Sequence, residues 1–345
     1  MIHKIEINEF IELSKSFTVL DVRSPGEYAH AHIPGAYSLP LFTDDERKVV
    51  GTAYKQQSKQ DAVKIGLDYF GVKMRKMVEE VEALQAELKK SEERTVIVHC
   101  WRGGMRSGGV AWLLDLYGFK VYQLIGGYKA YRNWALAQFS KEYPINVLGG
   151  YTGSGKTEVL HELKKSGAHI LDIEAIACHK GSAFGGFGMV QPSQEMFENT
   201  LALQLAGIDA TEENRIWVED ESRRIGDVNL PAIFFNTMQL APLYFVDIPF
   251  NERLTHIVSA YSKHKKEELV NAIIRIQKRL GGQDTKSAIN ALLENDYKSS
   301  FGILLRYYDK HYGKSLVTRE KSGIPLHQIS LATVDAVANS RHLVH

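Results

Sequence analysis

The chain has 345 residues, the length of two or three domains of about 100–200 residues each. Hydrophobic residues make up 44% and charged residues 24%, the proportions of a water-soluble globular protein. No segment approaches the roughly 18 consecutive apolar residues of a membrane span. The first residues lack the apolar core of a signal peptide, and two cysteines are too few for a disulfide framework. We therefore expect a cytoplasmic protein with reduced thiols and no membrane partner.

Residues 1–140 alternate between short apolar runs and helical segments. Strands are expected at residues 17–22, 95–100 and 120–124, where β-branched and other apolar residues gather. A helix is expected to begin after Ser24, which is followed by a first-position proline and by Glu27 of a capping box. Further helices are expected within 70–94, over 108–117 and after residue 126. This alternation predicts a parallel sheet with helices on both faces.

A second α/β unit is expected to begin near Pro144. It has candidate strands at residues 145–148, 168–173, 215–218 and 243–248, and a candidate helix at residues 157–165. Residues 251–312 have the spacing of apolar residues that helices show. The sequence thus predicts an α/β domain over residues 1–140, a second over 141–250, and a helical continuation of the second over 251–345.

The net charge of +1 conceals an uneven distribution. Between Arg253 and Lys321 there are fourteen Lys or Arg and seven Asp or Glu, a balance of +7. A basic surface of this kind favours an anionic partner such as RNA. A solvated helical surface explains the same charges equally well.

A cysteine in a loop with two glycines and two arginines follows the 95–100 strand. The run His99-Cys-Trp-Arg-Gly-Gly-Met-Arg-Ser107 places Cys100 between a strand and a helix. Such a loop points backbone N–H groups and a helix N-terminus at the sulfur, which favours a reactive thiolate. Arg102 and Arg106 add positive charge that could hold an anionic donor. Cys178 has no such setting, and we interpret it as an unreactive cysteine.

The second unit opens with a phosphate-binding loop. The run Gly150-Tyr-Thr-Gly-Ser-Gly-Lys-Thr157 matches the G-x4-G-K-T pattern, and it lies between an expected strand and an expected helix. Backbone N–H groups would wrap a phosphate, the lysine would neutralise it and the threonine would bind Mg²⁺. The candidate phosphate-binding residues are Gly150, Gly153, Ser154, Gly155, Lys156 and Thr157, with Thr157 as the candidate metal ligand.

Acidic residues near this loop are candidates for metal binding or acid–base chemistry. Glu219 and Asp220 follow an apolar run, so that either could hold a metal through water. Residues of this type also cap helices, which is the alternative interpretation. Asp172 and Glu174 end the expected 168–173 strand, where kinases with a phosphate loop place a carboxylate.

Residues 1–140 resemble a rhodanese domain. The resemblance rests on Leu20-Asp-Val-Arg-Ser-Pro-Gly-Glu-Tyr28, His32-Ile-Pro-Gly-Ala36, the cysteine loop and Gly126-Gly-Tyr128. It implies that the cysteine carries sulfur or selenium as a persulfide or perselenide, and that Asp21 and Arg23 pair behind the loop. Arg106 follows Cys100 by six residues, whereas many single-domain rhodaneses have five. The longer spacing is also that of rhodanese-like phosphatases, and it suggests a pocket for a tetrahedral, phosphate-bearing species.

Nearly the whole chain closely resembles the bacterial tRNA 2-selenouridine synthases. The order of the two units carries this resemblance, together with the runs Gly51-Thr-Ala-Tyr-Lys-Gln56, His179-Lys-Gly-Ser-Ala-Phe-Gly185 and Glu219-Asp-Glu-Ser-Arg-Arg-Ile-Gly226. The resemblance implies that the wobble 2-thiouridine of tRNA is first geranylated from geranyl diphosphate. The S-geranyl group is then replaced by selenium from selenophosphate, with no redox cofactor. The implied partners are tRNA carrying 2-thiouridine and a selenophosphate-supplying enzyme.

The resemblance assigns a half-reaction to each loop. Cys100 would form a perselenide while Arg102 and Arg106 hold phosphate, and the phosphate loop would grip the diphosphate leaving group instead of hydrolysing ATP. Residues 183–189 are the candidate slot for the geranyl chain, although their aromatic side chains could instead pack in the core. The candidate tRNA contacts are Lys263, Lys265, Lys266, Arg275, Lys278 and Arg279.

Two other function classes stay open. A rhodanese-type phosphatase could use the same cysteine through a phosphocysteine, but its loop supplies no general acid and leaves the phosphate loop unexplained. A nucleotide-gated sulfur carrier would close around ATP and modify no base.

Overall fold

The computed structural model describes residues 2–88, 94–182 and 184–343, and its contacts divide the chain into two compact units. The first unit comprises Met1–Gln138 together with Glu198–Leu203. The second comprises Phe139–Phe197 and Gln204–His345. A short segment from the middle of the sequence therefore belongs with the N-terminal unit.

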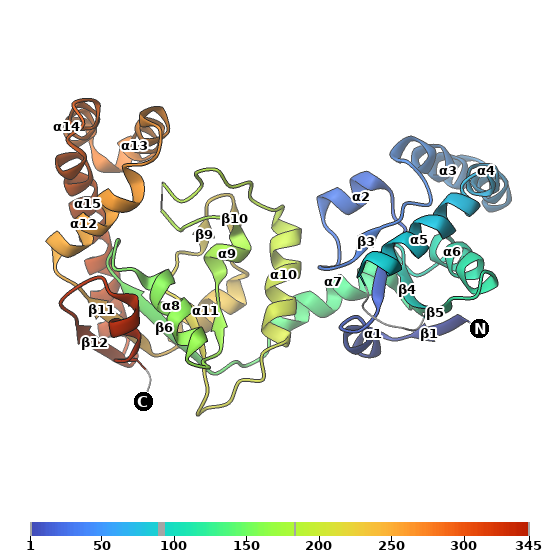
Figure 1. The fold of residues 1–345 in the computed structure, drawn as a ribbon, viewed down its shortest axis with the longest axis horizontal. Helices are drawn as coiled ribbons and strands as arrows, with labels where there is room; N and C mark the ends of the chain where they lie inside the picture. The colour runs from blue at the N-terminus through green and yellow to red at the C-terminus, as the bar shows by residue number, and fades with distance from the viewer. Residues whose placement is uncertain (1, 89–93, 183, 344–345) are drawn as a thin grey trace. The chain divides into compact units, whose positions relative to one another are not determined.

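The first unit is built on a five-stranded parallel sheet with the strand order β1-β5-β4-β2-β3 (Figure 1). Its strands are β1 (Ile2–Ile5), β2 (Thr18–Asp21), β3 (Tyr37–Ser38), β4 (Thr95–His99) and β5 (Lys120–Leu124). Its helices are α1 (Ile7–Leu13), α2 (Pro25–His30), α3 (Asp44–Gln56), α4 (Lys59–Gly71), α5 (Met74–Leu88), α6 (Met105–Leu116) and α7 (Gly127–Gln138). The α/β fold with a parallel sheet that the sequence predicted is confirmed.

Local sequence signals explain where the elements of the first unit begin. The predicted capping box starts α2, since Ser24 and Glu27 satisfy each other's backbone N–H groups and Pro25 occupies the first turn. The strands β2 and β4 are buried along their whole length, as strands covered on both faces must be. The edge strand β1 was not predicted; it has four residues, of which only Ile5 is buried.

The second unit contains another five-stranded parallel sheet, with the order β12-β11-β6-β8-β7 (Figure 1). Its strands are β6 (Ile145–Gly150), β7 (Ile170–Leu171), β8 (Ile216–Glu219), β11 (Leu243–Asp247) and β12 (Leu326–Ser330), beside an antiparallel pair of β9 (Arg224–Ile225) and β10 (Val228–Asn229). Its sheet-associated helices are α8 (Lys156–Lys165), α9 (Ile173–Ala177), α11 (Ala232–Leu240) and α16 (Ala336–Ser340). Helix α10 (Gln194–Ala206) supplies the segment that groups with the first unit.

The predicted helical part consists of α12 (Phe250–Tyr261), α13 (Lys266–Leu280), α14 (Gly282–Leu293) and α15 (Tyr297–Lys321). These helices enclose a common apolar core that includes Leu254, Leu269, Ala288 and Leu304. The chain then returns to the sheet as β12, a strand with no buried residue and hence a weak sequence signal. None of the helices in the described ranges is long and apolar enough to cross a membrane.

Candidate functional site

The cysteine loop connects β4 to α6 and requires glycine where the backbone comes close to its neighbours. Gly103 has a φ of +64°, and a Cβ there would lie 2.4 Å from the carbonyl oxygen of Leu124. Gly127 has a φ of +58°, and a Cβ there would lie 2.2 Å from the carbonyl oxygen of Cys100. Both contacts are too short for any side chain. The loop is therefore pressed against the turn that starts α7.

Cys100 lies at the base of this loop, and its side chain is only 3% exposed. Its Sγ is 3.3 Å from Oγ of Ser107 on α6, and Ser107 also accepts a hydrogen bond from Nε2 of Gln123 at 2.9 Å. The N–H of Tyr128 donates to the carbonyl of Cys100 at 2.8 Å, and the N–H of Lys129 donates to the carbonyl of Trp101 at 3.0 Å. The N–H groups of the first turn of α7, which precede the hydrogen bonds within that helix, thus hold the cysteine loop.

The two arginines of the loop differ in their surroundings. Arg106 donates from Nη1 to Oε2 of Glu27 at 2.7 Å, and Arg47 also contacts this carboxylate at 3.0 Å. Burial raises the pKa of Glu27, but the hydrogen bond and charge of Arg106 outweigh burial and bring it down to about 2. Arg102 is exposed. Glu27 therefore competes with an external anion for Arg106, whereas Arg102 reaches solvent.

The pairing of Asp21 with Arg23 that the rhodanese resemblance implied is confirmed. Both side chains are buried, and Arg23 donates from Nε and Nη2 to the carboxylate at 2.6–2.9 Å. Burial raises the pKa of Asp21, but the neighbouring His99 ring and the Arg23 guanidinium together lower it below its ordinary value. The guanidinium carbon also lies 3.9 Å from the ring centroid of Tyr128. This framework stands directly behind the cysteine loop.

The phosphate loop follows the buried strand β6 and precedes α8, as predicted. Gly153 and Gly155 have φ values of +83° and +72°, which turn successive backbone N–H groups inward. Nζ of Lys156 donates to the carbonyl of Gly150 at 3.0 Å, so that the lysine folds back over the loop. Ser154 is buried, and its Oγ has no hydrogen-bond partner within the described residues. The sequence between β6 and α8 therefore forms a cradle for an anion.

Three glutamates form a carboxylate cluster beside this loop: Glu174 on α9, Glu219 at the end of β8, and Glu221 just beyond it. Glu219 is buried, and the other two are half-buried. Thr157 donates from Oγ1 to Oε2 of Glu174 at 3.1 Å. A Cβ on Gly181 would lie 2.5 Å from a Glu221 oxygen and 2.8 Å from a Glu174 oxygen, so the two carboxylates meet beneath this glycine.

The surroundings raise the pKa of two carboxyl groups in this cluster well above the ordinary value. Glu219 is 1% exposed, and neither of its oxygens has a hydrogen-bond partner within the described ranges. Burial, reinforced by the charge of Glu174, raises the pKa of Glu219 to about 8. Burial and the charge of Glu174 also raise the pKa of Glu221 well above its ordinary value. Burial and mutual repulsion thus favour the protonated form of Glu219 and Glu221.

The two candidate aspartates are engaged elsewhere. The sequence predicted that Asp172 ends a strand of six residues, but β7 stops at Leu171. Asp172 instead caps α9, where its side chain accepts the N–H of Ala175 at 2.8 Å. Asp220 accepts from Tyr312 at 2.7 Å and from Arg319 at 2.8 Å. Glu221 was missed, although it lies two residues after Glu219 and alternate residues of an extended chain share a face.

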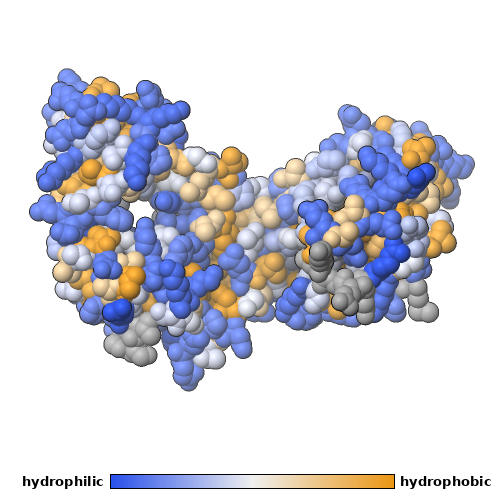
Figure 2. Space-filling model, viewed as in Figure 1, coloured by the Kyte–Doolittle hydropathy of each residue, from blue (hydrophilic) through white to orange (hydrophobic). Residues whose placement is uncertain are grey.

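The predicted tRNA contacts lie on or beside α13. Lys263 and Lys265 are exposed before the helix, and Nζ of Lys266 donates to the carbonyl of Leu293 at 2.9 Å. The visible surface of α13 and α14 is largely hydrophilic (Figure 2). Three exposed residues follow one another at helical spacing and form what we call the α13 basic face: Arg275, Lys278 and Arg279.

The aromatic side chains of the candidate geranyl slot pack against the helical core of the second unit. Phe184 is buried, and its ring lies 5.8 Å from that of Phe301 and 5.6 Å from that of Tyr261. Phe187 packs against the same helical core. Ala183, the first residue of the predicted slot, lies outside the described residues. The aromatic residues of this loop therefore anchor it to the helices.

Comparison with known proteins shows two family matches. A family described as the tRNA 2-selenouridine synthase AAA domain matches residues 143–341, and the rhodanese-like domain family matches residues 6–133. The "Crystal structure of N-terminal domain of putative ATP/GTP binding protein from Clostridium difficile 630" covers 38% of this chain and 98% of its own, with 40% identity and a TM-score of 0.35.

Several tRNA 2-selenouridine synthases align with most of the chain. That of Hydrogenovibrio crunogenus is 34% identical over 329 residues, which cover 86% of this chain and 89% of the relative. That of Pseudomonas savastanoi pv. phaseolicola is 35% identical over 327 residues, covering 85% and 87%. The Nitrosomonas europaea protein is 38% identical over 250 residues, covering 70% of this chain and 63% of its own length. The chain belongs to the tRNA 2-selenouridine synthase family.

Proposed function

We propose that this chain converts 2-thiouridine at the wobble position of tRNA into 2-selenouridine, through an S-geranylated intermediate. Membership of the tRNA 2-selenouridine synthase family supports the overall reaction. The observation that carries the division of labour is the presence of two anion-binding loops. One contains a buried thiol and the other a lysine and a threonine.

The phosphate loop is the proposed site of geranylation. Its N–H groups and Lys156 would bind the diphosphate of geranyl diphosphate. The thiocarbonyl sulfur of the base would attack the first carbon of the geranyl group, and the C–O bond to the diphosphate would break. Stabilising the charge of the leaving group is how such a loop accelerates the step.

Two side chains at the phosphate loop, those of Thr157 and Glu174, would hold a magnesium ion. Thr157 supplies a hydroxyl, and Glu174, in contact with it at 3.1 Å, supplies a carboxylate. Within the described ranges no group of three or more His, Cys, Asp or Glu side chains is arranged to hold a metal alone. Mg²⁺ commonly binds through one or two protein groups and the phosphates of the substrate, where it neutralises the leaving charge.

The cysteine loop is the proposed site of selenation. Cys100 would receive selenium from selenophosphate as a perselenide, with Arg102 and Arg106 holding the phosphate. The perselenide would then attack C2 of the geranylated base and displace geranylthiolate. Geranylthiolate would attack Sγ of Cys100 and break the S–Se bond, which releases 2-selenouridine and leaves a mixed disulfide between Cys100 and the geranyl thiol. Two equivalents of a low-molecular-weight thiol would reduce this disulfide and restore the Cys100 thiol. Forming the S–Se bond while phosphate leaves removes two electrons, so a low-molecular-weight disulfide is included in the assay as electron acceptor. Phosphorylation of Cys100 with release of selenide is the competing outcome, and the isotope pattern of selenium distinguishes the two adducts by mass spectrometry.

The basic residues around α13 are the proposed contacts for the tRNA backbone, and a selenophosphate-supplying enzyme is the proposed source of the donor. Positive side chains on a helix face attract phosphates irrespective of sequence. Such contacts position the RNA, while the two loops perform the chemistry.

Two variants test the proposed half-reactions separately. The purified full chain is incubated with 2-thiouridine tRNA, geranyl diphosphate and then selenophosphate together with the disulfide and its thiol, and the nucleosides are analysed by mass spectrometry. Cys100→Ser should stop selenation and leave geranylation intact, whereas Cys178→Ser, the matched control, should leave both steps intact. Lys156→Ala should raise the KM for geranyl diphosphate. Selenouridine formed by the Cys100→Ser protein would refute the role of the thiol, and unchanged geranylation by Lys156→Ala the role of the phosphate loop.

A further inference from the structure

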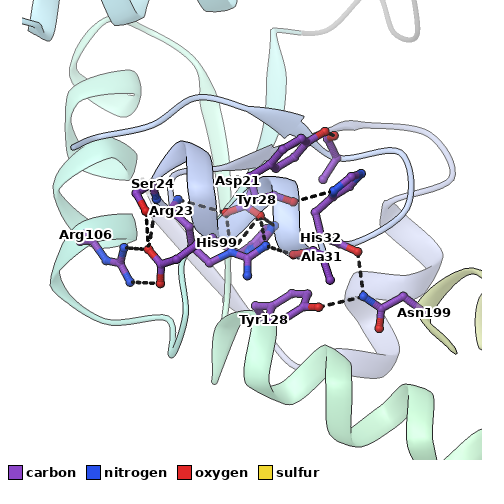
Figure 3. A network of polar contacts seen from close by, with 12 residues as sticks. Asp21, Arg23, Ser24, Tyr28, Ala31, His32, His99, Arg106, Tyr128 and Asn199 are labelled. Atoms are coloured by element: carbon purple, nitrogen blue, oxygen red, sulfur yellow. Dashed lines mark hydrogen bonds and ion pairs between the residues drawn. The ribbon is translucent and has the colours of Figure 1, made fainter. Parts of the chain in front are cut away.

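Asn199 belongs to the surroundings of Cys100, although it lies 99 positions further along the sequence and in no motif. It is part of the α10 segment Glu198–Leu203 that groups with the first unit. Its side chain is 0% exposed. Figure 3 shows it meeting Tyr128 and the backbone of His32 at the edge of the polar network behind the cysteine loop.

Every hydrogen-bonding group of the Asn199 side chain is used. Nδ2 donates to the carbonyl of His32 at 2.9 Å and to the hydroxyl of Tyr128 at 2.8 Å. Oδ1 accepts from Nη1 of Arg132 at 2.6 Å, and the backbone carbonyl accepts from the hydroxyl of Tyr131 at 3.0 Å. An amide side chain offers two donors and an acceptor, and this site uses all of them.

The bond to Tyr128 connects Asn199 with the cysteine. The N–H of Tyr128 donates to the carbonyl of Cys100 at 2.8 Å, so the residue that Asn199 holds by its hydroxyl holds the cysteine by its backbone. The ring of Tyr128 lies under the guanidinium of Arg23, which is locked to Asp21. Tyr128 is fully buried, so that its hydroxyl must find a partner inside the protein.

We propose that Asn199 is a positioning residue for Cys100, acting through Tyr128. The first unit thus takes one of the supports of its thiol site from the part of the sequence that follows the phosphate loop. When Asn199 is lost, the hydroxyl of Tyr128 and the carbonyl of His32 lose a donor in a buried environment. The start of α7 then no longer holds the cysteine loop in one arrangement. This role deepens the function proposed for Cys100, but it also has a readout that needs no tRNA.

The test measures alkylation of Cys100 by iodoacetamide in the full-length protein with Cys178→Ser, where Cys100 is the single thiol. Because Cys100 is 3% exposed, the reagent reaches it only when the loop opens. Asn199→Ala and Tyr128→Phe should each raise the alkylation rate about five-fold or more. The double variant should be no faster than the faster single variant, since both remove the same connection. Gln204→Ala, an exposed substitution on the same helix, is the control and should stay within about two-fold.

Thermal unfolding of each variant is measured alongside. If Asn199→Ala does not fold, the alkylation rate of Tyr128→Phe decides the test, because Tyr128→Phe removes only a hydroxyl group. Rates within two-fold of the parent for both single variants, or additive effects in the double variant, would overturn the proposal. In the tRNA assay, kcat for selenation should fall about ten-fold with KM for tRNA unchanged. If the parent protein makes no selenouridine while the alkylation pattern holds, the proposed function fails and the positioning role stands.

Discussion

Replacing the carboxyl of Glu219 by an amide tests the inference that the carboxylate cluster holds protons. In the folded protein the pKa of Glu219 is raised from 4.5 to about 8, first by burial and then by the charge of Glu174. The folded state therefore binds this proton more tightly than the unfolded state does. Glu219 costs nothing below about pH 4.5, and it lowers stability progressively as the pH rises towards 8.

The size of this effect follows from the two pKa values. Each pH unit between 4.5 and about 8 corresponds to about 1.4 kcal/mol, which gives an upper value of about 5 kcal/mol. The side chain is 1% exposed, so water screens little of it. Glu219→Gln, which has the shape of the protonated acid, should match the wild type at pH 5 and exceed its stability by about 3–5 kcal/mol at pH 8 to 9.

Hydrogen exchange followed by mass spectrometry on peptides from β6 and β8 measures the free energy of opening of this sheet apart from the first unit. The matched control is Glu213→Gln, an exposed glutamate in the same unit, which should change the opening free energy by less than about 0.5 kcal/mol at either pH. A Glu219→Gln protein that runs parallel to the wild type from pH 5 to pH 9 would show that Glu219 is ionised in the fold, and would refute the reasoning.

Other parts of the structure give three further predictions. Asp21→Leu should lower the free energy of unfolding by about 3–5 kcal/mol in urea denaturation, because it leaves the buried charge of Arg23 unpaired. The double variant Asp21→Leu with Arg23→Met should lose less stability than Asp21→Leu alone, and a larger loss would contradict this reasoning. Glu27→Gln should free Arg106 and tighten binding of inorganic phosphate several-fold by calorimetry, whereas unchanged affinity would mean that Arg106 does not face the anion. Replacing the α13 basic face by three glutamines should reduce the slope of log affinity for tRNA against log salt by about 2–3, and equal slopes would place the RNA elsewhere.

Much of the fold was predictable because its signals are local. The buried strands β2, β4, β5, β6 and β11 are short runs of β-branched and apolar residues, and the structure places each within one or two residues of the expected range. The cysteine loop and the phosphate loop were predictable because each has a glycine pattern between a buried strand and a helix. The strand expected at 168–173 is present but shorter, and the cause is equally local, since Asp172 is a strong helix cap that ends β7 and starts α9.

Other features had no local signal. The exposed strand β12 joins the sheet only because β11 offers a free edge beside it. Arg106 pairs with Glu27, which lies 79 positions earlier, and nothing near either residue in the sequence indicates this contact. In the sequence, Asn199 is an ordinary polar residue of a helix, and nothing beside it indicates its hydrogen bonds to His32 and Tyr128.

The sequence by itself determined the two loops on which the proposed function rests, one with a thiol and one with a lysine, each between a strand and a helix. Backbone conformation in such loops depends on a few neighbouring residues, above all glycines with positive φ. Only the tertiary structure decided which charges are paired, which carboxyl groups keep their protons and which distant residue supports Cys100. Burial and hydrogen bonding between remote segments set these properties, and neither can be read from residues that are neighbours along the chain.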